Sequence, residues 1–81
     1  MPDLSVAPKL QSFEVLADEA TPGKFILKMK YRAWYNQTVV DLVVVKDQIS
    51  EADTVDPDFW SDFYGNEVSN AYAAIGYTIA E

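Results

Sequence analysis

Residues 24–34 alternate strictly between two kinds of side chain, and this alternation constrains the fold more than any other feature of the chain. One set of alternate positions is apolar throughout and comprises Phe25, Leu27, Met29, Tyr31 and Ala33. The other set is mixed and comprises Ile26, Lys28, Lys30, Arg32 and Trp34. A period of two is that of a β-strand, and an apolar face opposite a mixed face is typical of an antiparallel sheet with one covered face.

Two further segments have the composition of strands. Residues 38–46 are rich in β-branched side chains, which favour a pleated sheet. Residues 9–17 form the other expected strand, with Leu10 and Leu16 on one face and Phe13 and Val15 on the opposite face. Consecutive strands with short connections usually pair as neighbours, so the three segments predict an antiparallel meander.

The pairing of the second and third strands follows from the length of their connection. If Asn36 and Gln37 form a two-residue hairpin loop, Arg32 lies opposite Asp41. In this register one face of the pair is entirely apolar, and we expect it to be the core face. A slip of one residue would move charged positions onto that face, so the pattern favours this register.

The C-terminal half predicts helix. Residues 47–55 are a polar connection, after which Asp56 suits the N-cap position and Pro57 the first helical position. An aromatic run follows and comprises Phe59, Trp60, Phe63 and Tyr64. Its helical spacing favours burial against the sheet, with one or two rings left as an anchor for a partner.

A second helix is expected after Gly65 and Asn66, which interrupt the first, with Asn66 as its N-cap. Its apolar stripe would comprise Val68, Tyr72, Ile75 and Ile79. Gly76 leaves two alternatives open. Either the helix continues to Ile79, or it stops at Gly76 and residues 77–80 form a short fourth strand.

The sequence therefore predicts an α+β fold: a three-stranded antiparallel meander with one or two C-terminal helices packed on one face. Residues 1–8 contain Pro2 and Pro8 and are expected to be an extended arm. Residues 9–81 are expected to form a single domain, with the meander at residues 9–46 and an acidic helical part at residues 56–80.

Composition excludes several kinds of chemistry. The chain has no Cys and no His, so disulfides, thiolate or imidazole metal sites and the usual hydrolase triads are excluded. Asp56, Asp58, Asp62 and Glu67 match several ligand positions of a calcium-binding EF-hand loop, but Trp60 and Ser61 occupy positions that need an oxygen ligand and a glycine. Nothing raises the pKa of one carboxyl selectively, as an acid–base pair requires. We therefore expect no cofactor, no metal and no enzymatic activity.

Charge divides the chain into two unlike parts. All six Lys and Arg residues lie before residue 47, and residues 47–81 contain eight acidic residues and no basic one. The net charge of −7 disfavours direct binding to nucleic acid. Clustered carboxylates on a small protein can instead imitate nucleic-acid phosphates and occupy the basic groove of another protein. The residues of this acidic patch are Asp53, Asp56, Asp58, Asp62 and Glu67.

The lead functional prediction is therefore a non-enzymatic protein-binding module, most specifically an inhibitor of a nucleic-acid-handling protein of the kind that phages and other mobile elements encode. The alternative interpretation of the same carboxylates is a helix face that only keeps a small protein soluble.

The mixed sheet face is the alternative interface, at Lys28, Lys30, Arg32, Trp34 and Val43. Either the N-terminal arm or the first strand covers it, or it binds another protein or a second copy of the chain. This face supports the second function that we consider, a structural subunit such as a virion decoration or connector protein. No apolar run approaches the roughly 20 residues of a membrane span, so we expect no membrane partner. The absence of Cys fits a location in the cytoplasm, including that of a host cell, or in a virion.

Overall fold

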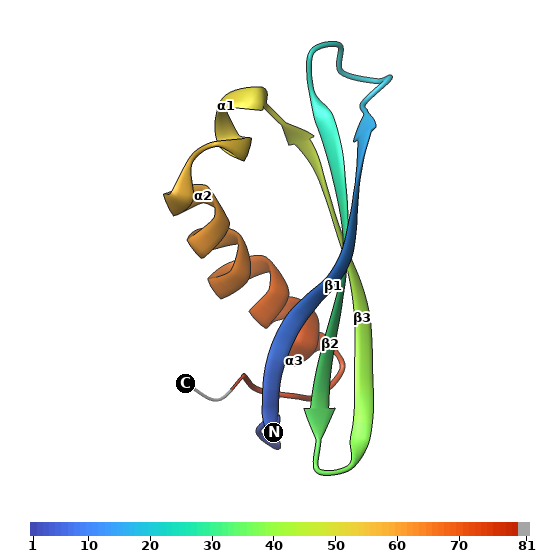
Figure 1. The fold of residues 1–81 in the computed structure, drawn as a ribbon, viewed down its shortest axis with the longest axis vertical. Helices are drawn as coiled ribbons and strands as arrows, with labels where there is room; N and C mark the ends of the chain where they lie inside the picture. Colours follow the sequence, from blue (N-terminus) through green and yellow to red (C-terminus); the bar gives the residue numbers. More distant parts are fainter. Residues whose placement is uncertain (80–81) are drawn as a thin grey trace.

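The protein is an α+β fold in which a three-stranded antiparallel sheet is followed by helices on one face. The computed structural model describes residues 1–79, and its strands are β1 (Val6–Ala17), β2 (Phe25–Tyr35) and β3 (Thr38–Ile49), in the order β1-β2-β3. A short helix α1 (Glu51–Thr54) leads to a continuous helical segment of 18 residues. This segment comprises α2 (Pro57–Asp62), a π-helical turn η1 (Phe63–Val68) and α3 (Ser69–Ala74). Figure 1 shows all of these helices on the same side of the sheet.

The predicted register of β2 and β3 is confirmed. Tyr35 pairs with Thr38 across a two-residue turn, and Arg32 lies opposite Asp41. Asn36 in the turn has φ of 55°, a left-handed conformation that Asn tolerates better than most residues. The core face of the pair is therefore the predicted one.

The predicted faces of β1 are wrong at Leu10. The register with β2 shifts between Leu10 and Ser12, so Gln11 is an extra residue in β1 and forms a bulge. As a result Leu10 pairs with Tyr31 and lies on the helix side of the sheet, together with Phe13 and Val15. Of the two leucines expected on the opposite face, only Leu16 lies there.

The third strand is longer than predicted. It continues to Ile49, which pairs with Phe25 after an irregularity in the register and is almost fully buried. Gln48 has φ of 56° at this irregularity, and the local bend returns Ile49 to the core face. The segment predicted as a polar connection therefore contributes a core residue before α1 begins.

The predicted break at Gly65 and Asn66 is absent, since the chain stays helical through both. The π-helical turn instead accommodates one extra residue, which places Phe63 and Val68 on the buried face although they are five positions apart. The helix ends at Ala74, where Gly76 has φ of 96° and the amide of Tyr77 donates to the carbonyl of Tyr72 (3.0 Å).

This stop decides between the two alternatives for Gly76, because the helix does not continue to Ile79, and it corrects the expectation for Ile75. Ile75 was expected in the core but lies beyond the last helical residue and is 48% exposed. Within the described residues, the predicted fourth strand is a single parallel bridge between Asp3 and Thr78, and Ala80 lies outside them. The amide of Leu4 donates to the carbonyl of Thr78 (2.9 Å), and Leu4 itself is buried. The N-terminal arm is therefore fixed to the C-terminal segment.

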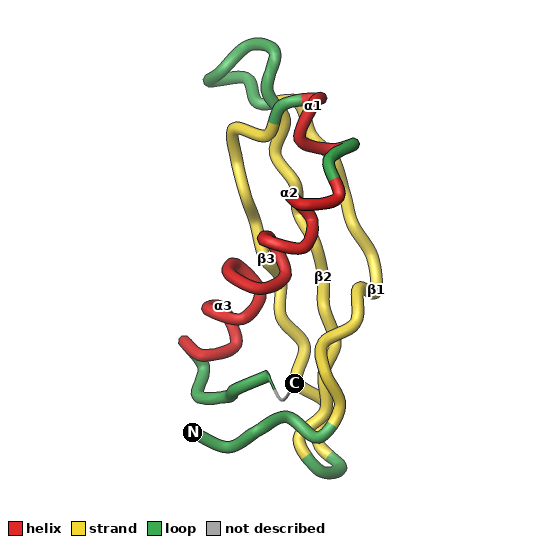
Figure 2. The backbone as a smooth tube through the Cα atoms, turned by 90° about the vertical axis from the view of Figure 1, so that its left-hand side faces the viewer, coloured by secondary structure: helices red, strands yellow, loops and turns green. Residues whose placement is uncertain are grey.

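The helical segment covers only part of the sheet. Figure 2 shows it crossing the strands obliquely, with α3 at the β3 side. Its most buried side chains are those of Phe63, Val68 and Tyr72. The Tyr72 hydroxyl donates to the carbonyl of Val40 (3.0 Å), and burial raises the pKa of this hydroxyl to about 12. The oblique crossing leaves the helix-side face of β1 largely open.

Candidate protein-interaction surfaces

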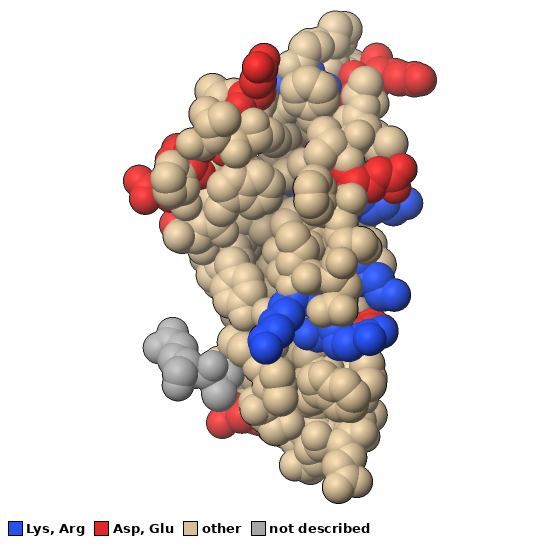
Figure 3. All heavy atoms as spheres, viewed as in Figure 1, with Lys and Arg blue, Asp and Glu red and all other residues tan. Residues whose placement is uncertain are grey.

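Three exposed carboxylates lie along the start of the helical segment, and we call Asp56, Asp58 and Asp62 the acidic ridge. Asp58 and Asp62 are four residues apart and therefore neighbours on one side of α2. Within residues 1–79 no hydrogen bond or ion pair engages either side chain. Figure 3 shows Asp and Glu atoms over α1 and α2 on the left of the molecule, whereas on the right Asp and Glu atoms lie next to Lys and Arg atoms.

Asp53 and Asp56 also stabilise the helix ends. The Asp53 carboxylate accepts from the amide of Ser50 (3.2 Å) in a capping box, and the Asp56 carboxylate accepts from the amide of Asp58 (3.0 Å) at the start of α2. Asp53 is half-buried as a result. These two carboxylates therefore hold the scaffold on which Asp58 and Asp62 are presented.

Within the described residues Glu67 forms an ion pair, unlike the carboxylates of the ridge, although it lines the same hollow as Asp62. Its carboxylate lies 2.8 Å from the ammonium group of Lys46 on β3. Together with Asp62, the pair lines a small hollow of about 160 Å³ between the helix and β3. Asp53 thus lies on α1, Asp56 at the N-cap of α2 and Asp58 and Asp62 on α2, while Glu67 is paired with Lys46 on β3.

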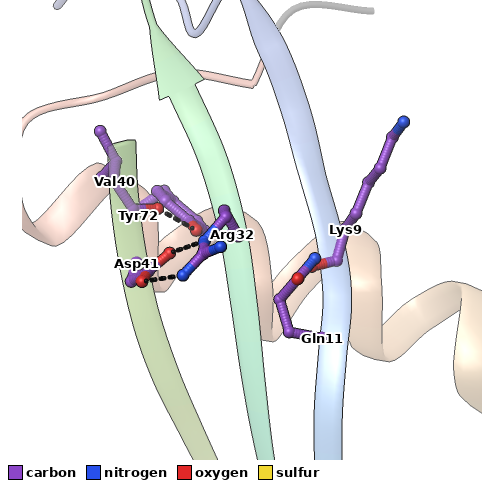
Figure 4. A network of polar contacts seen from close by, with 6 residues as sticks. All are labelled: Lys9, Gln11, Arg32, Val40, Asp41 and Tyr72. Carbon is purple, nitrogen blue, oxygen red and sulfur yellow. Dashed lines mark hydrogen bonds and ion pairs between the residues drawn. The ribbon is translucent and has the colours of Figure 1, made fainter. Parts of the chain in front are cut away.

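The alternative interface is a continuous sheet face on the side away from the helices. Lys28, Lys30, Arg32 and Trp34 lie on it through β2, and Val43 pairs with Lys30 from β3. Figure 4 shows Arg32 and Asp41 facing each other across the two strands. The guanidinium donates from Nε to Oδ1 (2.8 Å) and from Nη2 to Oδ2 (3.0 Å), and these hydrogen bonds hold the pKa of the Asp41 carboxyl below its usual value.

Of the two alternatives for this face, cover by the arm or the first strand is not what the structure shows. β1 lies in the same sheet as an edge strand, and the arm pairs with the C-terminal segment. Val43 is 52% exposed, and Val39 and Val45 are exposed beside it. Within residues 1–79 the face is open to a partner.

A third surface was not found from the sequence. It is an apolar groove of about 490 Å³ between β1 and the helices, and it opens toward the viewer in Figure 3. One wall carries Leu10, Phe13 and Val15 of β1, and the other carries Trp60 and Tyr64. The residues that complete its lining are Pro8, Leu27, Met29, Tyr31 and Thr54.

Two hydrogen bonds fix the helical wall of the groove. The Trp60 indole donates to the carbonyl of Thr54 (2.9 Å), and the Tyr64 hydroxyl donates to the carbonyl of Pro8 (3.1 Å). The groove could not be predicted from the sequence, because only the bulge at Gln11 places Leu10 on the same face of the sheet as Phe13. The sequence signal available was the excess of large apolar residues on this strand.

The described residues contain no cluster of His, Cys, Asp or Glu side chains arranged to hold a metal ion. None of the helices in residues 1–79 is both long and apolar enough to cross a membrane. Comparisons with family models, with curated proteins and with solved structures find no match to this chain.

Proposed function

We propose that this protein is a non-enzymatic binding module that inhibits a nucleic-acid-handling protein by placing carboxylates in its basic groove. The observation that carries the proposal is the acidic ridge, where Asp58 and Asp62 are exposed and unpaired among the described residues. On this account the protein acts where its partner acts, in the cytoplasm of a host cell if a phage or other mobile element encodes it.

The physical basis is the dominance of phosphate charge in nucleic-acid binding. A groove that holds nucleic acid is lined by Lys and Arg, and its positive potential attracts any matching array of negative charges. Most cations of this protein lie on the opposite side of the sheet, where Lys28 and Lys30 are exposed. The unequal charge of the two sides would orient the protein, ridge first, toward a basic surface.

Rigidity also supports the proposal. The capping hydrogen bonds of Asp53 and Asp56 fix the starts of α1 and α2, and the Trp60 indole ties α2 to the carbonyl of Thr54. Phe63 then anchors the following turn in the core. Carboxylates on a fixed scaffold lose little conformational freedom on binding.

The test begins with capture of the partner on the tagged full chain and then measures association rates over a range of salt concentrations. We expect a steep fall with added salt and a slower association for the D58N/D62N double variant, because steering acts on exposed charge. The control compares the single variant D58N with E19Q, which removes the same charge from an exposed position in the connection between β1 and β2. Equal effects of the two variants, or insensitivity to salt, would contradict the proposal.

A second candidate function rests on the open sheet face. Val39, Val43 and Val45 are exposed together with cations on a face that no described segment covers. Contiguous exposed apolar surface of this kind marks protein–protein contacts, so a structural subunit of a larger assembly is the second proposal. A native mass measurement distinguishes the two proposed functions. A discrete oligomer or concentration-dependent assembly supports the structural subunit, and a monomer supports the inhibitor.

A further inference from the structure

We propose that the groove between β1 and the helices holds an extended segment of a basic partner protein, which adds as a strand to the outer edge of β1 along residues 12–17. The segment carries apolar side chains at alternate positions and Lys or Arg beside them. This inference rests on the proposed function in that the occupant belongs to the partner, but the mode of binding is a separate claim.

The first support is the edge itself. β1 pairs only with β2, so its outer backbone groups have no strand partner within residues 1–79. Pro8, Lys9 and the bulge at Gln11 obstruct the first half of this edge, as is common in natural sheets. From Ser12 to Ala17 the register with β2 is unbroken, and this stretch contains no Pro and no Lys. The second half of β1 is therefore a regular template for an added strand.

The second support is the apolar wall on the same stretch. Phe13 is 65% exposed and Val15 is 48% exposed, although both lie on the side of the sheet that carries the core. A strand added beside β1 would place alternate side chains on this side, next to both residues and opposite Trp60. The groove of about 490 Å³ thus supplies room for apolar side chains of that strand.

The third support is the net charge, which favours a basic occupant. Among the described residues, the lining of the groove carries no charged side chain, and the chain as a whole carries a net charge of −7, which attracts a positively charged segment. A second copy of the chain fits poorly. Its own residues 12–17 carry Glu14 and no cation, and two molecules of charge −7 repel each other.

The experiment uses the full chain labelled with ¹⁵N and a synthetic peptide of about eight residues that alternates Leu with Lys. The control peptide has Pro at two central positions, because Pro cannot donate a ladder hydrogen bond. We expect the first peptide to shift the amide signals of residues 12–17 and the indole signal of Trp60, and to slow amide exchange along that stretch. The Pro peptide should bind at least about tenfold more weakly.

Two matched variants locate the site. F13S and V43S each remove an exposed apolar side chain from a strand, on opposite faces of the sheet. We expect F13S to weaken peptide binding at least about tenfold and V43S to leave it within about twofold. Equal binding of both peptides, with shifts confined to the acidic ridge, would overturn the inference. Self-association of the wild-type chain through residues 12–17 would also overturn it, since the occupant would then be a second copy.

The two proposals fail in distinguishable ways. If binding of the captured partner weakens in D58N/D62N but is unchanged in F13S, the groove inference is wrong and the proposed function stands. If binding of the captured partner is unchanged in D58N/D62N but abolished in F13S, the nucleic-acid-mimic function is wrong and the groove inference stands.

Discussion

Phe63 and Val68 are five residues apart in the sequence, yet both pack into the core and are only 3% and 0% exposed. A regular α-helix brings residues three or four apart to the same face, so the π-helical turn between them is what aligns the two side chains. Glu67, in the same turn, forms an ion pair with Lys46 on β3. The helical segment thus binds the sheet through Phe63 and Val68 and leaves the acidic ridge exposed.

Truncation of Phe63 should unfold much of the domain. F63A removes a buried ring from a small core and should cost roughly 3–5 kcal/mol of unfolding free energy. For a chain of this size that lowers Tm by more than about 12 °C, measured by circular dichroism. F13A is the matched control and should melt within a few degrees of wild type, because Phe13 is largely exposed. A small effect of F63A would show that this helix face is not the core.

Replacing Gly65 or Gly76 with alanine should change the stability of the protein in opposite directions. At both Gly65 and Gly76 an added Cβ would meet no atom within 4 Å, so the backbone alone decides the outcome. Gly65 lies inside the helical segment, and G65A should stabilise the protein by about 0.5–1 kcal/mol. Gly76 has φ of 96°, which strains any side chain, so G76A should destabilise it by about 1 kcal/mol or more. Urea unfolding of both variants checks the prediction, and a loss of stability in G65A would contradict it.

Tyr72 should make the fold sensitive to alkali. Its hydroxyl has a pKa of about 12 in the folded protein against about 10 in an unfolded chain, so the folded state retains the proton more strongly. The contribution to stability is complete below pH 10 and is lost as pH rises from about 10 to about 12.

Y72F tests this directly. At neutral pH it should cost about 1 kcal/mol, because it removes the hydrogen bond to the Val40 carbonyl. Above pH 10 its urea midpoint should fall less steeply than that of wild type. Burial also raises the pKa values of Tyr31 and Tyr64, so part of the alkaline loss should remain. Identical pH profiles for Y72F and wild type would contradict the assignment.

The hairpin of β2 and β3 could be predicted because two independent signals agree. The two-residue turn sets the register, and the alternation from Phe25 to Ala33 sets the core face, so Arg32 and Asp41 were placed correctly. The same alternation correctly placed Lys28 and Lys30 on the opposite, exposed face of the sheet.

The bulge and the π-helical turn could not be predicted in the same way. Each is one extra residue whose effect depends on what packs on either side, and neither Gln11 nor Gly65 marks it by its chemistry. Gly65 and Asn66 have the composition of a helix break, but packing of Phe63 and Val68 against the sheet keeps the chain helical. The groove depends on the bulge and was missed with it.

We propose that the acidic ridge takes the place of nucleic acid on a basic partner. The most direct test adds the protein to the captured partner while a fluorescent oligonucleotide is bound and follows anisotropy. We predict that the anisotropy falls to the value of the free oligonucleotide as the protein saturates the partner, and that D58N/D62N needs at least about tenfold more protein to release it. A stable ternary complex, in which the oligonucleotide stays bound while the protein binds elsewhere, would contradict it.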